Sequence, residues 1–236
     1  MGIKGFSLVE MAVVLAIISV LLIGLIGPLS TQEEVRRIKE TERRIENIKE
    51  ALIGFAVSRG RLPCPATAIS LGQEVAAGGD CGVGLYDGFV PAVTLSVNPV
   101  DEQGYALDAW QNRIRYSVAN VNNGGANVLT TNNSIVGVNN MELAAASASL
   151  LTVCDDSICT TTLANSIAAT VYSLGPNGAI PAASMDEIEN TDGDVTFVKR
   201  PPRDADHADG AFDDVVDWLS VSVLFGRMAQ IGQIPN

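Results

Sequence analysis

The sequence predicts an α+β protein in which a long N-terminal helix packs on a small antiparallel β-sheet head. Three observations lead to this fold class. The chain begins with an apolar run, continues with an amphipathic pattern of helical period, and then becomes rich in Gly, Asn, Thr and Ser with short apolar runs. The helix is therefore expected to be apolar up to residue 29 and amphipathic over 30–61, with a globular head at 62–236.

The apolar run is long enough to cross a membrane. No charged residue lies between Met11 and Leu29, and the one polar side chain there is that of Ser19. At about 1.5 Å per residue, such a helix matches a hydrocarbon core of about 30 Å. The alternative is a buried core helix, but soluble helices of this length normally keep a polar face. No small-residue cleavage pattern follows, so we expect a retained single-pass anchor with Lys4 on the cytoplasmic side and the head outside.

The segment after Pro28 keeps the helical period and gains a polar face. Its apolar residues recur at steps of three, four and seven, at Val35, Ile38, Ile45, Ile48, Leu52 and Phe55. Pro28 can bend a membrane helix without ending it, whereas Pro63 and Pro65 forbid continuation, so the helix should end near 58–60. Packing of the apolar face on the head is favoured over a coiled coil, because the stripe is short.

Short strands are predicted in the head where apolar runs lie between turn residues, at NRIRYSVA, NVLTT, SIVGV, SLLTVC, ATVYSLG and DVTFV. VNNGGANVLTTNNS reads as a surface loop or hairpin, and MELAAASASLLTV can begin as a short helix. FDDVVDWLSVSVLFGRM fits neither the strand period nor the helix period cleanly, so it stays open between the two.

The distribution of charge and of reactive residues excludes two broad classes of function. The formal charge is −12, and from Leu62 onward twenty acidic residues face six Lys or Arg. Such a head repels phosphate backbones, which disfavours nucleic-acid binding. His207 is the one histidine, and no phosphate-binding loop, dinucleotide fingerprint or catalytic constellation is present, so an enzyme is not expected.

The four cysteines predict disulfides. Outside the cytoplasm disulfides persist, and four cysteines allow three pairings. Short local loops favour Cys64 with Cys81 and Cys154 with Cys159. A zinc site is the rival interpretation, although the spacings are not those of structural zinc sites.

Two acidic loops are candidates for a bound cation. NTDGDV contains Asp192 and Asp194, and DADHADGAFDD ends in Asp213 and Asp214. Calcium prefers six to eight oxygen ligands on a turning backbone, which such loops can supply. The four carboxylates are therefore candidate calcium ligands, and the alternative is plain solvated loops.

GFSLVEMAVVLAII at the N-terminus resembles the signature of type IV pilins and type II secretion pseudopilins. The resemblance implies a leader at 1–5, removed by a prepilin peptidase between Gly5 and Phe6, and a transmembrane half-helix at 6–29. It also implies methylation of the new N-terminus. An acid in hydrocarbon costs at least a few kcal/mol, so Glu10 indicates a function. By family analogy its carboxylate pairs with the Phe6 amine of an adjacent subunit and guides assembly.

The resemblance continues in three segments of the head. DAWQNRIRY is similar to the D-P-W-G-N-P-Y-x-Y segment of major pseudopilins, from which Gln111, Arg113 and Ile114 depart. YSLGPNG resembles the S-x-G-x-D-G turn that follows, and FDDVVDW resembles the later acidic segment. In that family a loop between the last two carries calcium, but the loop here is much longer, so individual ligands do not carry over.

Together these patterns predict a structural subunit of a type IV filament system, either a pseudopilin of secretion or a minor pilin. Its implied partners are the prepilin peptidase, other pilin or pseudopilin subunits and an inner-membrane assembly platform. Its implied location is the bacterial inner membrane, with a periplasmic head that can enter a filament. The alternative is a pilus-borne adhesin or binding module, which the scarcity of exposed aromatic anchors makes less favoured.

Overall fold

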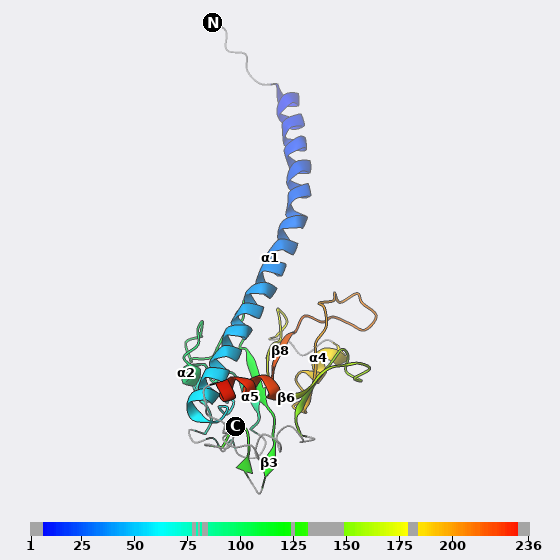
Figure 1. Cartoon of the computed structure of the whole chain (residues 1–236). Coiled ribbons are helices and arrows are strands. Elements are labelled where there is room, and N and C mark those ends of the chain that lie inside the picture. Colours follow the sequence, from blue (N-terminus) through cyan, green and yellow to red (C-terminus); the bar gives the residue numbers. More distant parts are fainter. Residues whose placement is uncertain are drawn as a thin grey trace. The chain divides into compact units, whose positions relative to one another are not determined.

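The computed structural model describes residues 7–76, 79, 81, 85–123, 126–131, 149–178 and 184–230, with the backbone alone at 21–31. The chain divides into two compact units, Met1–Lys39 and Glu40–Asn236. Helix α1, Leu8–Arg59, begins in the first unit and ends in the second (Figure 1). Among the described residues, no helix is long and apolar enough to cross a membrane. The expected transmembrane half, 6–29, includes residues whose side chains lie outside the described part of the chain.

Helix α1 passes Pro28 without a break and ends where the sequence predicts. Gly60 follows its last residue at φ 65°, in the left-handed region that glycine adopts at low cost, and its N–H donates to the Ala56 carbonyl at 2.8 Å. The chain then leaves the helix axis, and the Leu62 N–H donates to the Leu129 carbonyl at 2.7 Å. The expected end near 58–60 is confirmed.

The described residues of the second unit form one six-stranded sheet and one pair of short antiparallel strands. The sheet strands are β1 Asp87–Phe89, β2 Arg115–Val118, β5 Leu151–Cys154, β6 Thr162–Ser173, β7 Thr196–Val198 and β8 Val215–Ser220. Their order is β1-β2-β6-β5-β7, and β8 also pairs with β6. The short pair consists of β3, Asn122–Asn123, and β4, Ala126–Asn127, within the Asn/Gly-rich segment.

The structure confirms the α+β fold with a long helix packed on a mostly antiparallel sheet, and one pairing makes the sheet mixed. β5 and β7 run parallel, while the other pairs in the sheet are antiparallel. The chain leaves β6, passes through the short helix α4, Met185–Glu189, and returns on the far side of β5. A crossover of this kind makes the parallel pairing possible.

The core of the second unit lies between α1 and the sheet. The buried face of α1 consists of Ile45, Ile48, Leu52, Ile53 and Ala56, which belong to the same cluster as Tyr116, Val171 and Leu219 from the strands. This confirms that the amphipathic face packs on the head. Val35, counted in that face from its spacing, is 45% exposed in the first unit. Burial of each large aliphatic side chain contributes about 1.5–3 kcal/mol.

Polar contacts fix α1 to β8 and to the loop before β2. Lys49 Nζ lies 2.7 Å from Asp217 Oδ2 on β8, and Arg44 Nη1 donates to the Leu107 and Asp108 carbonyls at 2.9 and 2.7 Å. Burial of the Lys49 ammonium lowers its pKa, but hydrogen bonds to Asp217 and Glu46 outweigh this effect and hold the pKa of Lys49 above its usual range. These contacts hold the helix in place on the head.

The segment that fitted neither period contains one element of each kind. β8 covers its first part, and helix α5, Val221–Gln230, follows at once. Ser220 ends the strand, and its Oγ accepts from the Val223 N–H at 3.3 Å, as a residue that caps a helix does. The pattern was ambiguous because the period changes inside the segment.

Other local predictions had mixed outcomes. Of NVLTT, expected as a strand, Asn127 alone lies in one, and the residues after it form a turn. A short helix, α2 at Ala92–Leu95, was not foreseen. SIVGV and the start of MELAAASASLLTV lie outside the described residues.

Candidate functional site

The first turn of α1 is closed by Ser7 and Glu10. The Ser7 N–H donates to Glu10 Oε2 at 3.0 Å, and the Val9 N–H donates to Ser7 Oγ at 3.3 Å. Both N–H groups lack a partner within the helix, so Ser7 caps the first turn through the Val9 N–H, and Glu10 bonds back to the Ser7 N–H as the glutamate of a capping box does. Glu10 thus has a local role that the sequence reasoning missed, although the spacing S-x-x-E signals it. Gly5 and Phe6 lie outside the described residues.

Residues 7–20, the part of the apolar run whose side chains the structure describes, present those side chains to the surroundings. Every residue from 7 to 20 is exposed, and the most exposed aliphatic residues are Leu8 at 89%, Val9 at 70% and Val20 at 70%. An apolar surface of this extent is rare on a soluble monomer and indicates a membrane or a partner.

Both disulfides have the pairing that loop length favoured. Cys64 is bonded to Cys81, and Cys154 to Cys159. The first closes the segment after α1, where Arg61 also pairs with Glu74 through nearly buried side chains, with Arg61 Nη1 and Glu74 Oε2 2.7 Å apart. The second closes a tight loop after β5. Cross-links of this kind restrict the unfolded chain.

The four candidate calcium ligands do not form one site. Asp213 and Asp214 gather with Glu187, while Asp192 and Asp194 gather with Glu189, each group with carboxylate oxygens within 4.8 Å of one another. Both glutamates belong to α4, and the sequence did not predict them as members of a carboxylate group. The segment MDEIE by itself does not indicate which distant acids will lie next to it. The two loops thus supply two separate carboxylate groups, and calcium binding stays a prediction.

The two carboxylate groups differ in burial. Glu187 and Asp214 are buried, whereas Asp192 and Asp194 are exposed. Burial raises the pKa of Asp214 to about 8, against a hydrogen bond from Asn190 Nδ2 at 2.7 Å that lowers it. The nearby charges of Glu187 and Asp213 act in the same direction as burial. In the buried group, a bound proton or cation would therefore relieve more unfavourable electrostatic energy than in the exposed group.

A test of this electrostatic assignment is Asp214→Asn. The folded pKa lies above the unfolded value of about 3.9, so the stability associated with the proton is full below pH 4 and is lost as the pH rises to about 8. Asparagine stays neutral, so the variant should be the more stable protein at pH 8, by an amount on the order of a few kcal/mol, and equal to the parent near pH 4. Urea unfolding of the full chain across this range measures it.

Asp192→Asn is the matched control, because it makes the same change in an exposed side chain of the other carboxylate group. In that group, partial burial and nearby acids raise the pKa of Glu189. No pH-dependent difference of similar size is expected for Asp192→Asn. A parent and Asp214→Asn that differ equally at pH 4 and pH 8 would contradict the raised pKa.

The three head segments that resemble pseudopilin motifs contact one another. Ser173 Oγ donates to Asp108 Oδ2 at 2.6 Å, and Asn112 Nδ2 donates to the Gly175 carbonyl at 2.7 Å, so DAWQN is bonded to YSLGPNG. Gly175 has φ 60°, and a Cβ placed there would lie 2.2 Å from Asp213 Oδ1. Glycine is required where these backbones approach, which joins FDDVVDW to the same cluster.

Gln111 departs from the resembled motif at a position with a special backbone. Its φ is 71°, in the left-handed region, where the pseudopilin segment has glycine. A side chain in this region costs about 1 kcal/mol. The turn keeps its shape because Asp108 Oδ1 accepts from the Trp110 and Asn112 N–H groups, each at 2.8 Å.

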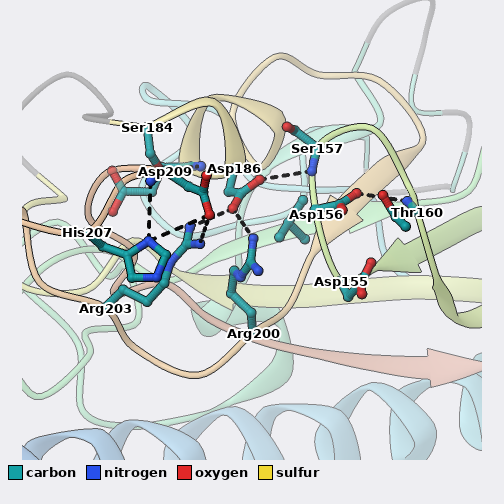
Figure 2. A network of polar contacts seen from close by, with 12 residues as sticks. Asp155, Asp156, Ser157, Thr160, Ser184, Asp186, Arg200, Arg203, His207 and Asp209 are labelled. Carbon is teal, nitrogen blue, oxygen red and sulfur yellow. Dashed lines mark hydrogen bonds and ion pairs between the residues drawn. The ribbon is translucent and has the colours of Figure 1, made fainter.

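A polar network surrounds Asp186 at the start of α4 (Figure 2). This buried carboxylate accepts from Arg200, from Arg203 Nη2 at 2.7 Å and from the Ser157 N–H at 2.9 Å. Burial alone would raise its pKa, but these donors hold the pKa of Asp186 below its usual range. The network connects the Cys154–Cys159 loop to the segment after β7.

Comparison with known proteins points to the N-terminus alone. Residues 1–26 match the family model described as the prokaryotic N-terminal methylation motif. The motif is a class III prepilin signal, typical of type IV pilins and pseudopilins, and it implies a subunit of that general kind, which a prepilin peptidase processes. No curated protein and no solved structure matches the chain.

Proposed function

We propose that this chain is a structural subunit of a type IV filament system, a pseudopilin or minor pilin held first in the inner membrane and then packed into a filament. The observation that carries the proposal is the prepilin-type N-terminus at the head of one unbroken helix, α1, whose later half packs on an α+β head. The exposed apolar surface of residues 8–20 supports it, because such a surface requires lipid or neighbouring helices.

The work of such a subunit is mechanical. Cleavage between Gly5 and Phe6 leaves the apolar helix in place and creates an amine at Phe6, and the Glu10 carboxylate of an adjacent subunit pairs with that amine. Two charges that are each costly in an apolar bundle become tolerable together. The implied partners are the prepilin peptidase, other subunits and an inner-membrane assembly platform. Calcium binding stays a separate prediction, now for the group Glu187, Asp213 and Asp214.

The test is the intact mass of the chain extracted from its native membrane without reductant. A chain that starts at Phe6, carries one methyl group and lacks four cysteine hydrogens is expected. An uncut chain from Met1, in cells with an active prepilin peptidase, would overturn the processing step and with it the proposed pairing of Glu10.

A further inference from the structure

A pocket of about 300 Å³ opens on the head beside the Asp186 network. Its walls come from the Cys154–Cys159 loop, from the start of α4 and from the segment after β7, which are far apart in the sequence and adjacent in Figure 2. Its lining shares no residue with the two carboxylate groups described above. The pocket therefore needs an explanation of its own.

The rim of the pocket is acidic. Three carboxylates, those of Asp156, Asp186 and Asp209, line the pocket, together with the guanidinium of Arg200. Arg200 and Arg203 pair with Asp186, and Arg203 Nη1 also lies 3.2 Å from Asp209 Oδ2, so these carboxylates still outnumber the cations around them. The Asp209 side chain is 66% exposed. Over residues 155–158, 184–186 and 200–209, six carboxylates face two guanidinium groups, a formal charge of −4. A cationic ligand is favoured at such a rim and an anionic one is repelled.

Two aliphatic side chains stand at the same rim. Ile158 is 83% exposed and Met185 is 68% exposed, and both line the pocket. Covering such side chains is favourable by about 25 cal/mol per Å² of apolar surface. Metal ions do not cover apolar surface, so this pair indicates an organic ligand with an alkyl part.

The walls are already fixed in place. The disulfide closes the loop, the Ser157 N–H is bonded to Asp186, and Asp156 Oδ1 accepts from the Thr160 N–H at 2.8 Å. A site that is formed before binding loses little conformational entropy when a ligand arrives.

We infer that this pocket binds a protein partner through a Lys or Arg side chain next to an aliphatic residue. The alkyl stem of the cation lies on Ile158 and Met185, and its charged end meets Asp156 and Asp209. The head of a second copy is a poor partner, because the heads share the same acidic excess. The inference concerns the head alone and does not depend on the proposed filament role.

The test uses an acetylated, amidated and fluorescently labelled peptide, Gly-Leu-Arg-Leu-Arg-Gly, with Gln in place of Arg as the control peptide. Binding to the full chain in a nonionic detergent is followed by fluorescence anisotropy at about 0.15 M salt. We expect the Arg peptide to bind and the Gln peptide to bind at least about tenfold more weakly.

Three double variants locate the site. Asp156→Asn with Asp209→Asn, and Ile158→Ser with Met185→Ser, should each weaken binding about tenfold. Asp192→Asn with Asp194→Asn removes the same charge elsewhere and should change binding by less than about twofold. The altered side chains at Ile158, Met185 and Asp209 are exposed, so the fold should survive, which unfolding midpoints check. Equal weakening by the control pair, equal binding of the Gln peptide, or no binding of the Arg peptide would each overturn the inference.

Discussion

Glu10→Ala is expected to abolish entry of the chain into filaments while the head still folds. Under the proposed function, the Phe6 amine of a neighbouring subunit enters an apolar bundle and needs a carboxylate there. Removing one partner of a buried ion pair costs about 3–5 kcal/mol, because the other charge stays buried and uncompensated. A loss of this size repeated at every subunit contact stops growth of an assembly.

Two measurements separate assembly from folding. Filament content is measured in the sheared fraction of cells that carry the complete assembly system. Head folding is measured by formation of the Cys64–Cys81 and Cys154–Cys159 disulfides in the same cells. Normal incorporation of Glu10→Ala would show that the charge-pairing account is wrong.

The capping contact allows a sharper comparison. Glu10 bonds to the Ser7 N–H, and glutamine at the same position can accept that bond without carrying a charge. If charge pairing drives assembly, Glu10→Gln fails like Glu10→Ala, and Ser7→Ala, which removes the hydroxyl cap but keeps the carboxylate, assembles. If the cap is what matters, Glu10→Gln assembles and Ser7→Ala is impaired.

The parts of the fold that local chemistry determines could be predicted from the sequence. The amphipathic period placed Ile45, Ile48 and Leu52 on the buried face, and the prolines after residue 61 placed the helix end. Loop length favoured the observed disulfides. These features depend on residues close together in the chain, where spacing carries the signal.

Features that depend on distant residues could not be predicted. The parallel pairing of β5 and β7 follows from a crossover through α4, and the grouping of Asp213 with Glu187 follows from where that helix lies. FDDVVDWLSVSVLFGRM was ambiguous since its period changes at Ser220, where the strand gives way to α5. The sequence identified the acidic residues, but it did not show which of them lie together in the fold.

Asp108→Ala is expected to destabilise the head by about 3–5 kcal/mol, a large part of the stability of a typical domain. The Asp108 side chain is fully buried and accepts three hydrogen bonds, from the Trp110 and Asn112 N–H groups and from Ser173 Oγ. Truncation leaves these donors buried without an acceptor. Arg44 of α1 donates to the Leu107 and Asp108 carbonyls at this same turn. Loss of the turn therefore also weakens the contact between α1 and the rest of the head.

Asp108→Asn is the matched control for this loss. Burial raises the pKa of Asp108, against the donors that lower it, so a neutral isostere is tolerated there. Its amide oxygen can accept from both N–H groups while its NH₂ faces the Ser173 hydroxyl, and we expect a loss of about 1 kcal/mol or less. Urea unfolding of the full chain in a nonionic detergent, followed by tryptophan fluorescence, measures both variants. Equal losses for alanine and asparagine would mean that the charge of Asp108, and not its three hydrogen bonds, holds the turn to the sheet.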